Sequence, residues 1–245
     1  MKNPICLSTG PVHEFVPDFN ERIAKVRGFE PDGVEICLAK PEELLGFVVS
    51  EENLKYLLGL KWVSIHAPVQ NIMYCDDELS RKVLAKAEEL ARQINAQNVV
   101  FHRKEIEDPK ILENYNFTAS LENLDFRSPG CMQNVAEVKE ELDKNNNLKL
   151  TFDFAHAFSI DPDSVSDFVK EFRDKIVEYH VAFLDKDTSG RSSYHWFLHK
   201  NDSEQLRSLL RYLNNPDIPI IIESTAAKKE EVDWFAAEIK YLREI

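Results

Sequence analysis

The residue types best suited to chemistry in this chain stand at the ends of short apolar runs. The six endings are His66, His102, Glu122, Asp153, His180 and Glu223, which close segments 62–66, 99–102, 119–122, 150–153, 177–180 and 220–223. Short β-rich runs that are flanked by helical segments predict buried parallel strands. The last residue of such a strand lies at the carboxyl edge of the sheet, where α/β barrels assemble their active sites. Six ligand-type endings therefore indicate one shared site.

Four of these endings would hold one divalent ion. Glu122, Asp153 and Glu223 place three carboxylates in one barrel mouth. Carboxylates that converge in this way repel each other and shift their pKa values unless a cation neutralises them. His180 completes a donor set of two Glu, one Asp and one His. We therefore predict a metal site here, with Glu122 and Glu223 as its catalytic carboxylates.

Histidines from neighbouring segments would hold further ions. His66 and His102, with Glu122 as a bridging ligand, would bind a second ion, and imidazole with carboxylate favours zinc. Asp153 and His156, with His195 from the long loop after the seventh strand, form a third ligand cluster. A lone histidine at a strand end is usually a core or loop residue, but several that converge with carboxylates indicate metal binding. The nearby His199 fits either the loop surface or the site.

Basic residues follow the same strands. Arg103 comes directly after His102, Arg127 follows Glu122, and Lys186 and Arg191 lie in the long loop. Basic loop residues are usually only solvated. On the metal face, however, they would bind an anionic substrate such as a phosphate ester.

The elements that position these residues are those of an α/β barrel. Two further strand candidates, at 5–8 and 33–37, give eight strands that start near residues 5, 33, 62, 98, 118, 149, 177 and 219. Most intervals are close to ~30 residues, the length of a strand, a helix and two loops. Apolar residues at helical spacing predict helices over 77–91, 134–142, 163–172 and 230–242, with Leu79, Val83 and Leu84 on the buried face of the first. A helical stub at 109–114 and an irregular loop at 185–201 complete a single-domain (β/α)8 TIM barrel over residues 1–245.

Length and composition agree with this architecture. A chain of 245 residues matches one barrel, and 43% hydrophobic residues are enough for a sizeable core. The net charge of −13 argues against a broad basic surface for nucleic acid. The four cysteines form no Cys-x-x-Cys pair, which is typical of a reduced intracellular protein. The sequence has neither a signal peptide nor a run of ~20 apolar residues, so we expect a cytoplasmic protein without a membrane segment.

Several motifs resemble a known superfamily. They are Ser-Ile-His-Ala-Pro at 64–68, Val-Val-Phe-His at 99–102, Leu-Glu-Asn at 121–123, Asp-Phe-Ala-His-Ala-Phe at 153–158 and Ile-Ile-Glu-Ser at 221–224. In this order they resemble the xylose isomerase-like barrels, and most of all the endonuclease IV family, zinc enzymes that nick DNA at abasic sites. The resemblance implies two or three Zn²⁺ ions, with abasic-site DNA or a phosphorylated small molecule as the partner. It also implies an Asp-x-His motif in the long loop, where this chain has Ser193 in place of the Asp.

Three functions are compatible with these residues. The first is a metal-dependent phosphoester hydrolase, in which ions that share Glu122 activate water and stabilise the leaving oxygen, with Glu122 or Glu223 aligning the nucleophile. The second is a sugar or sugar-phosphate isomerase or epimerase, in which a single Mn²⁺ or Mg²⁺ chelates the substrate and Glu122 and Glu223 move a proton. The third is a barrel that binds metal without catalysis. His66 and His102 favour the first, because a one-metal isomerase does not require them, whereas the acidic net charge favours the second.

Overall fold

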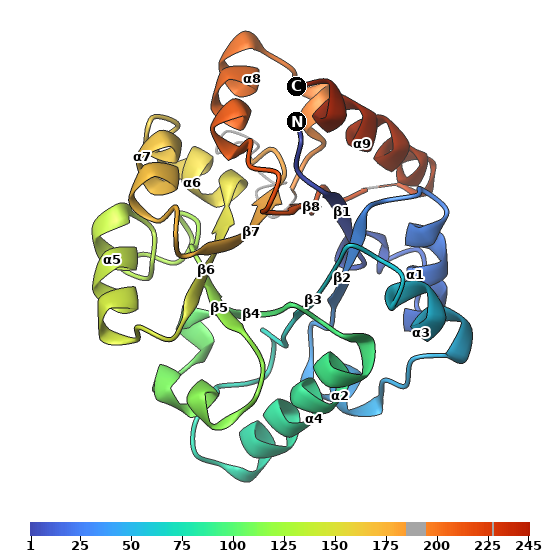
Figure 1. Cartoon of the computed structure of the whole chain (residues 1–245), viewed down its shortest axis with the longest axis vertical. Coiled ribbons are helices and arrows are strands. Elements are labelled where there is room, and N and C mark those ends of the chain that lie inside the picture. Colours follow the sequence, from blue (N-terminus) through green and yellow to red (C-terminus); the bar gives the residue numbers. More distant parts are fainter. Residues whose placement is uncertain (185–194, 227) are drawn as a thin grey trace.

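Eight parallel strands close into a barrel, and their order around the ring follows their order along the chain (Figure 1). The computed structural model describes residues 1–184, 195–226 and 228–245. The strands are β1 (Ile5–Ser8), β2 (Gly33–Cys37), β3 (Trp62–His66), β4 (Asn98–His102), β5 (Ala119–Glu122), β6 (Lys149–Asp153), β7 (Ile176–Val181) and β8 (Ile220–Ile222). β1 pairs with both β2 and β8, which closes the ring. The predicted (β/α)8 TIM barrel is confirmed, and every predicted strand is present.

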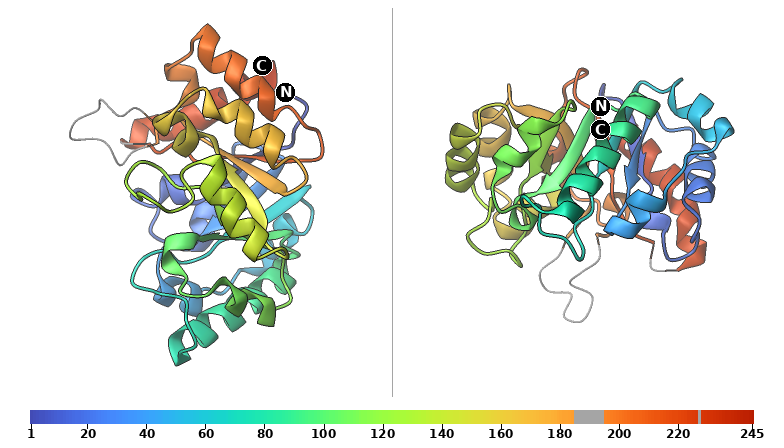
Figure 2. Two further views of the ribbon diagram at one scale, coloured as in Figure 1. Left: turned by 90° about the vertical axis from the view of Figure 1, so that its left-hand side faces the viewer. Right: turned by 90° about the horizontal axis from the view of Figure 1, so that it is seen from below.

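Helices surround the barrel on its outer side (Figures 1 and 2). The α-helices are α1 (Phe19–Arg27), α2 (Pro41–Gly46), α3 (Glu51–Leu57), α4 (Glu78–Ile94), α5 (Val135–Lys144), α6 (Phe154–Ile160), α7 (Ser164–Glu171), α8 (Glu204–Leu210) and α9 (Trp234–Glu244). Short 3₁₀ segments are η1 (Gly10–Val12), η2 (Arg103–Glu105), η3 (Pro109–Asn114), η4 (Leu198–Lys200), η5 (Arg211–Leu213) and η6 (Lys229–Asp233). The predicted helices are confirmed, although the segment predicted at 230–242 starts with η6. Across the described ranges, no helix has the length and apolar character needed to cross a bilayer.

The longest helix, α4, shows how the sequence sets a helix and its buried face. Asp77 caps it, because its side chain accepts a hydrogen bond from the backbone N–H of Ser80 at 2.7 Å. Val83 and Leu84 are fully buried, as their helical spacing predicts. Leu79, predicted on the same face, is 40% exposed. It lies in the first turn of the helix, next to the fully buried Ser80.

The connection between β4 and β5 contains no α-helix. It forms only η2 and η3, and η3 confirms the predicted stub at 109–114. The loop after β3 covers the strands here instead. Its residue Tyr74 forms an isolated backbone bridge with Ile106, and its ring lies 5.3 Å from that of Phe101 in β4.

The apolar core lies between the strands and the helices. Side chains of a strand alternate between two faces, so every second residue of each strand points outward to the helices. Phe152 of β6 packs on Phe168 of α7 with ring centroids 5.2 Å apart. Near the chain end, Phe197 packs on Phe235 of α9 at 5.1 Å. All four rings are buried.

The inside of the barrel is unusually polar. TIM barrels normally fill this space with bulky branched side chains. Here Asn98 donates hydrogen bonds to Ser120 Oγ at 2.7 Å and to Glu178 Oε1 at 2.9 Å. Trp62 Nε1 donates to the other oxygen of Glu178 at 2.9 Å, and Ser120 is bonded to Thr151 at 2.6 Å. The predicted metal ligands at the strand ends therefore rest on a hydrogen-bonded polar floor, formed by Asn98, Ser120, Thr151 and Glu178, rather than on hydrocarbon.

We expect Gly33→Ala to destabilise the fold. A Cβ at this position in β2 would meet the backbone carbonyl oxygen of Trp62 and lie 2.6 Å from Cys6 Sγ, so neighbouring strands would have to shift. Overpacking of this kind costs about 1–3 kcal/mol. The measurement is the free energy of unfolding in urea. Gly46→Ala is the matched control, because nothing lies within 4 Å of a Cβ there. Equal stability of the two variants would contradict the role of Gly33.

Candidate metal centre

All eight predicted metal ligands converge at the carboxyl edge of the barrel. Their donor atoms form three groups whose atoms lie within 4.8 Å of one another: His66, His102 and Glu122; Glu122, Asp153, His180 and Glu223; and Asp153, His156 and His195. Glu122 belongs to the first two groups and Asp153 to the last two. The three groups therefore form one continuous row of candidate ligands.

Strand register brings the ligands together. His102 is the Cα partner of Glu122 across β4 and β5, and Asp153 is the partner of His180 across β6 and β7. Residues two apart on a strand share a face. The ligands therefore form the layer directly above the polar floor residues.

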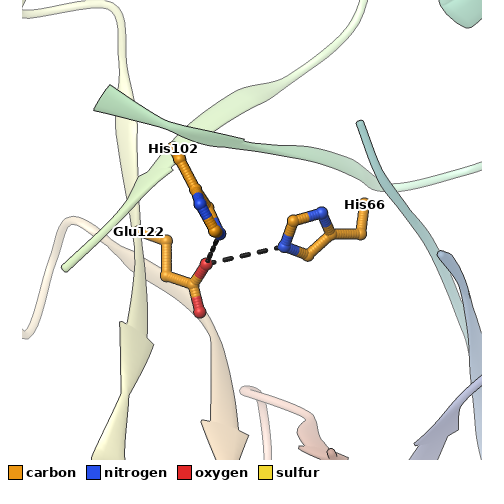
Figure 3. Close-up of side chains that lie close together, drawn as sticks. All are labelled: His66, His102 and Glu122. Carbon is orange, nitrogen blue, oxygen red and sulfur yellow. Dashed lines mark ion pairs between the residues drawn. The ribbon is translucent and has the colours of Figure 1, made fainter. Parts of the chain in front are cut away.

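The first group surrounds one carboxylate oxygen (Figure 3). His102 Nε2 lies 2.7 Å from Glu122 Oε2, and His66 Nε2 lies 3.5 Å from the same oxygen. The two imidazole rings lie 5.0 Å apart and nearly perpendicular. Despite these short distances, Glu122 Oε2 makes no hydrogen bond. Two imidazole nitrogens that converge on one carboxylate oxygen form a donor set for a shared ion.

The second group lies on the other side of Glu122. His180 Nδ1 is 3.2 Å from Glu122 Oε1 and 3.4 Å from Glu223 Oε2. Ligands of a tetrahedral zinc ion lie roughly 3.3 Å apart, given zinc–ligand lengths of ~2.0–2.1 Å. These separations, like that between His66 and Glu122, fit the donor set to such an ion.

Local helix geometry places the third group. Asp153 ends β6 and also caps α6, because its side chain accepts from the backbone N–H of His156 at 2.7 Å. Because His156 lies in the first turn of α6, three residues after Asp153, its side chain also lies at the barrel mouth. Asn123 fixes the end of β6 through two hydrogen bonds to the backbone of Asp153. The Asn123 side chain accepts a hydrogen bond from the Asp153 N–H at 2.7 Å and donates one to the Asp153 carbonyl oxygen at 2.9 Å.

The base of the long loop brings His195 to the site. Phe183 and Trp196 exchange backbone hydrogen bonds of 2.8 and 2.7 Å. The ring of His195 lies 5.3 Å from that of His156, and its Nδ1 lies 3.9 Å from Glu223 Oε2. Ser193, Lys186 and Arg191 lie outside the described residues. His199 does not join the centre, because its Nδ1 pairs with the buried Glu238.

The three carboxylates have very different proton affinities. Burial raises the pKa of Asp153 to about 8, and the adjacent histidine offsets only part of this effect. Burial acts in the same direction on Glu122, but the charge of the adjacent His102, together with His180, holds the pKa of this carboxyl well below its usual range. For Glu223, His180 likewise outweighs burial and the pKa falls to about 2.

The histidines also divide into two kinds. Burial lowers the pKa of His66, but Glu122 and the other carboxylates outweigh it and raise the pKa to about 9. The pKa of His180 rises well above its usual value, because Glu223 and other carboxylates outweigh burial. Burial lowers the pKa of His195 to about 4. Without metal, the centre therefore holds protons that a cation would have to displace.

A cavity of about 450 Å³ opens over the ligands. Arg127, one of the four predicted substrate-binding residues, lines it, and its Nε donates to Asp125 Oδ2 at 2.6 Å. Arg103 does not line it. Its Nε lies 2.8 Å from Glu141 Oε1, in a groove beside α5, because η2 directs the chain outward immediately after His102. The structure therefore does not bring Arg103 to the metal centre.

Sequence reasoning missed other residues of this region. Lys40, in the loop after β2, lines the cavity and follows its strand as the predicted basic residues follow theirs. Glu35 and Glu178 lie fully buried beneath His180 and form a fourth group of possible ligands with it. Each lies in the middle of a strand, on the strand face that points into the barrel below the ligands. This position is the sequence signal that could have identified them. Glu178 stands two residues before His180 on β7 and so shares its face.

Comparisons with known proteins agree with this fold. A family model described as xylose isomerase-like TIM barrel matches residues 23–245. No curated protein matches the chain in sequence. Among solved structures, endonuclease IV from Thermus thermophilus is 15% identical, with 99% of this chain and 100% of that chain covered and a TM-score of 0.67. D-allulose 3-epimerase from Methylomonas sp. is 15% identical, with 99% and 97% covered and a TM-score of 0.70. The probable 3-DHS dehydratase AsbF from Bacillus anthracis is 15% identical, with 99% of each chain covered and a TM-score of 0.71. At these identities the likeness shows the fold alone.

Zinc affinity should rise with pH. A zinc ion at the predicted site would have to displace the protons of Asp153, with a pKa of about 8, and of His66, with a pKa of about 9. Raising the pH toward these values removes that competition, so the apparent affinity should increase between about pH 6 and pH 8.5. Competition with a chromogenic chelator at several pH values measures this, with the chelator's own pH dependence subtracted. Affinity that is constant over this range would contradict the assignment.

Proposed function

Because the chain belongs to the xylose isomerase-like TIM barrel family, we propose that it is a metal-dependent phosphoester hydrolase with a multinuclear zinc centre. The observation that carries the proposal is the group of His66, His102 and Glu122 beside the four-ligand group. A one-metal isomerase needs only the latter. Two histidines that converge on the free side of Glu122 supply a second site of the kind that zinc prefers.

Glu122 is suited to bridge two ions. Its Oε2 faces His66 and His102, whereas its Oε1 faces His180. The carboxylate is 1% exposed, so it makes these contacts without competition from water. Zinc ions bound on both sides would activate water and stabilise the leaving oxygen of a phosphoester.

The remaining roles fall to side chains that line the cavity. Glu223 is the most accessible carboxylate of the four-ligand group, with a side chain 15% exposed, and in this proposal it aligns the nucleophile. Arg127 and Lys40 line the same cavity and supply positive charge for an anionic substrate. Asp125 holds Arg127 in place through its hydrogen bond.

The substrate we propose is a phosphorylated small molecule or the abasic site of DNA. A cavity of about 450 Å³ is the size of a small-molecule site. The net charge of −13 favours a compact substrate over a long stretch of nucleic acid.

The four cysteines are free thiols, which suits an enzyme of the cytoplasm.

The second candidate is a sugar or sugar-phosphate epimerase that uses one Mn²⁺ or Mg²⁺. It is favoured by the position of Glu122 and Glu223, whose carboxylates both lie close to His180 Nδ1 and therefore close to each other. Two carboxylates on opposite sides of a bound sugar would serve as base and acid on carbon. A barrel that binds metal without catalysis is the third, and metal content together with activity on phosphoesters and sugars separates all three.

We expect two or three zinc ions per chain. The three ligand groups share Glu122 and Asp153, so each shared carboxylate would join neighbouring ions. Elemental analysis of protein purified without chelator measures the content. One manganese or magnesium ion with no zinc would rule out the hydrolase and leave the epimerase.

Replacing both His66 and His102 by Ala should abolish phosphodiester cleavage, with a loss of at least ~10³-fold in kcat, because the second ion stabilises charge in the transition state. The assay uses an abasic-site duplex and small phosphoesters with zinc, beside a panel of ketoses and sugar phosphates. The double variant should retain one ion at the four-ligand group.

His13→Ala is the matched control, since His13 lines the cavity but belongs to none of the ligand groups among the described residues. Epimerase activity that survives in the double variant would select the second candidate. A protein that binds zinc but converts none of these substrates would support the third.

A further inference from the structure

The ring of His180 has a different environment at each nitrogen. Nδ1 faces the ligand layer, 3.2 Å from Glu122 Oε1 and 3.4 Å from Glu223 Oε2. Nε2 faces the polar floor, 3.1 Å from Glu35 Oε2 and 3.4 Å from Glu178 Oε1. His180 is completely buried, and Asp153 of the same ligand group is a fifth carboxylate near its ring.

The two floor carboxylates are not equivalent. Glu178 has partners of its own, because Trp62 Nε1 and Asn98 Nδ2 each donate to it at 2.9 Å. Glu35 is equally buried, yet neither of its oxygens makes a hydrogen bond that meets geometric criteria. His180 Nε2 lies 3.1 Å from its Oε2. A buried carboxylate without donors is costly, so its retention in the barrel centre calls for a partner.

We infer that Glu35 is a positioning residue, which accepts the Nε2 proton of His180 and thereby fixes Nδ1 as the nitrogen that faces the metal. A neutral imidazole carries one proton, and the hydrogen bond made by one nitrogen decides which nitrogen is left for a metal. Carboxylate acceptors of this kind orient the ring and increase its basicity as a ligand. Glu178 supports the floor, whereas Glu35 serves His180 directly.

Glu35, Glu178 and His180 also lie close enough together to bind a metal ion, because their ligand atoms are within 4.8 Å of one another. Such an ion at Nε2 would compete with the proposed use of Nδ1, because the ring would have to lose both protons to serve two metals. A proton shared with Glu35 avoids that conflict. The inference rests on the metal centre of the proposed function, but not on which reaction the centre performs.

The test compares three variants by zinc affinity and by the unfolding of metal-free protein in urea. Glu35→Met removes the acceptor with little change in length, and should weaken zinc binding by about 10–100-fold. Its unfolding midpoint should fall less than that of Glu178→Met, because Glu35 has His180 Nε2 beside it whereas Glu178 accepts hydrogen bonds from both Trp62 and Asn98. Glu35→Gln keeps an acceptor oxygen and should restore much of the affinity.

Glu178→Met is the matched control from the same floor. It leaves Trp62 and Asn98 without their acceptor, so its unfolding midpoint should fall while its zinc affinity changes less than that of Glu35→Met. Wild-type affinity in Glu35→Met would overturn the inference. A loss of one bound ion with unchanged affinity for the rest would also overturn it, and would instead assign an ion to the floor.

The outcomes also separate this inference from the proposed function. If the wild-type chain binds zinc but cleaves no phosphoester, the hydrolase is rejected while the comparison of Glu35 with Glu178 still decides the positioning role. If the wild-type chain binds no divalent cation, the metal centre and the positioning role fail together.

Discussion

Burial of opposite charges at one edge of the barrel is the constraint on which the rest of this structure depends. Glu122 and Asp153 are each 1% exposed, and His180 is not exposed at all. Charges removed from water in this way are tolerable only when partners surround them closely. Glu122 and Glu223 each lie beside the imidazole of His180, and a divalent cation would complete the balance of charge that these side chains begin.

This constraint reaches downward into the barrel. A ligand layer set on hydrocarbon would leave the lower side of His180 without a partner. The interior instead carries Glu35, Asn98 and Glu178, where α/β barrels usually carry branched apolar residues. The apolar core moves to the outer face of the strands, where Phe152 packs on Phe168. Stability and chemistry thus occupy opposite faces of the same strands.

The site also shows why membership of the family does not choose a reaction. The group of Glu122, Asp153, His180 and Glu223 can serve hydrolysis or proton transfer on carbon, because both need a cation and a pair of carboxylates. The feature that favours hydrolysis is the pair of further histidines, His66 and His102, that lie close to Glu122 Oε2. The chemistry we propose depends on that difference rather than on the fold.

The sequence by itself determined the strands, the helices α4, α5, α7 and α9, and the candidate ligand residues. Strand endings such as His102 and Glu122 are predictable because β-rich runs of fixed length deliver their last residue to a common edge. Asp77 and Asp153 are readable as helix caps because capping depends on residues only three apart. These signals are local, so a single chain suffices to find them.

Only the tertiary structure decided which residues meet across the barrel. Glu35 lies far from His180 along the chain, and closure of the ring brings them within 3.1 Å. Arg103 follows a ligand directly, yet η2 turns it outward to Glu141. Such contacts depend on strand register and on the direction of each side chain, which arise when all eight strands pair and which no local pattern encodes.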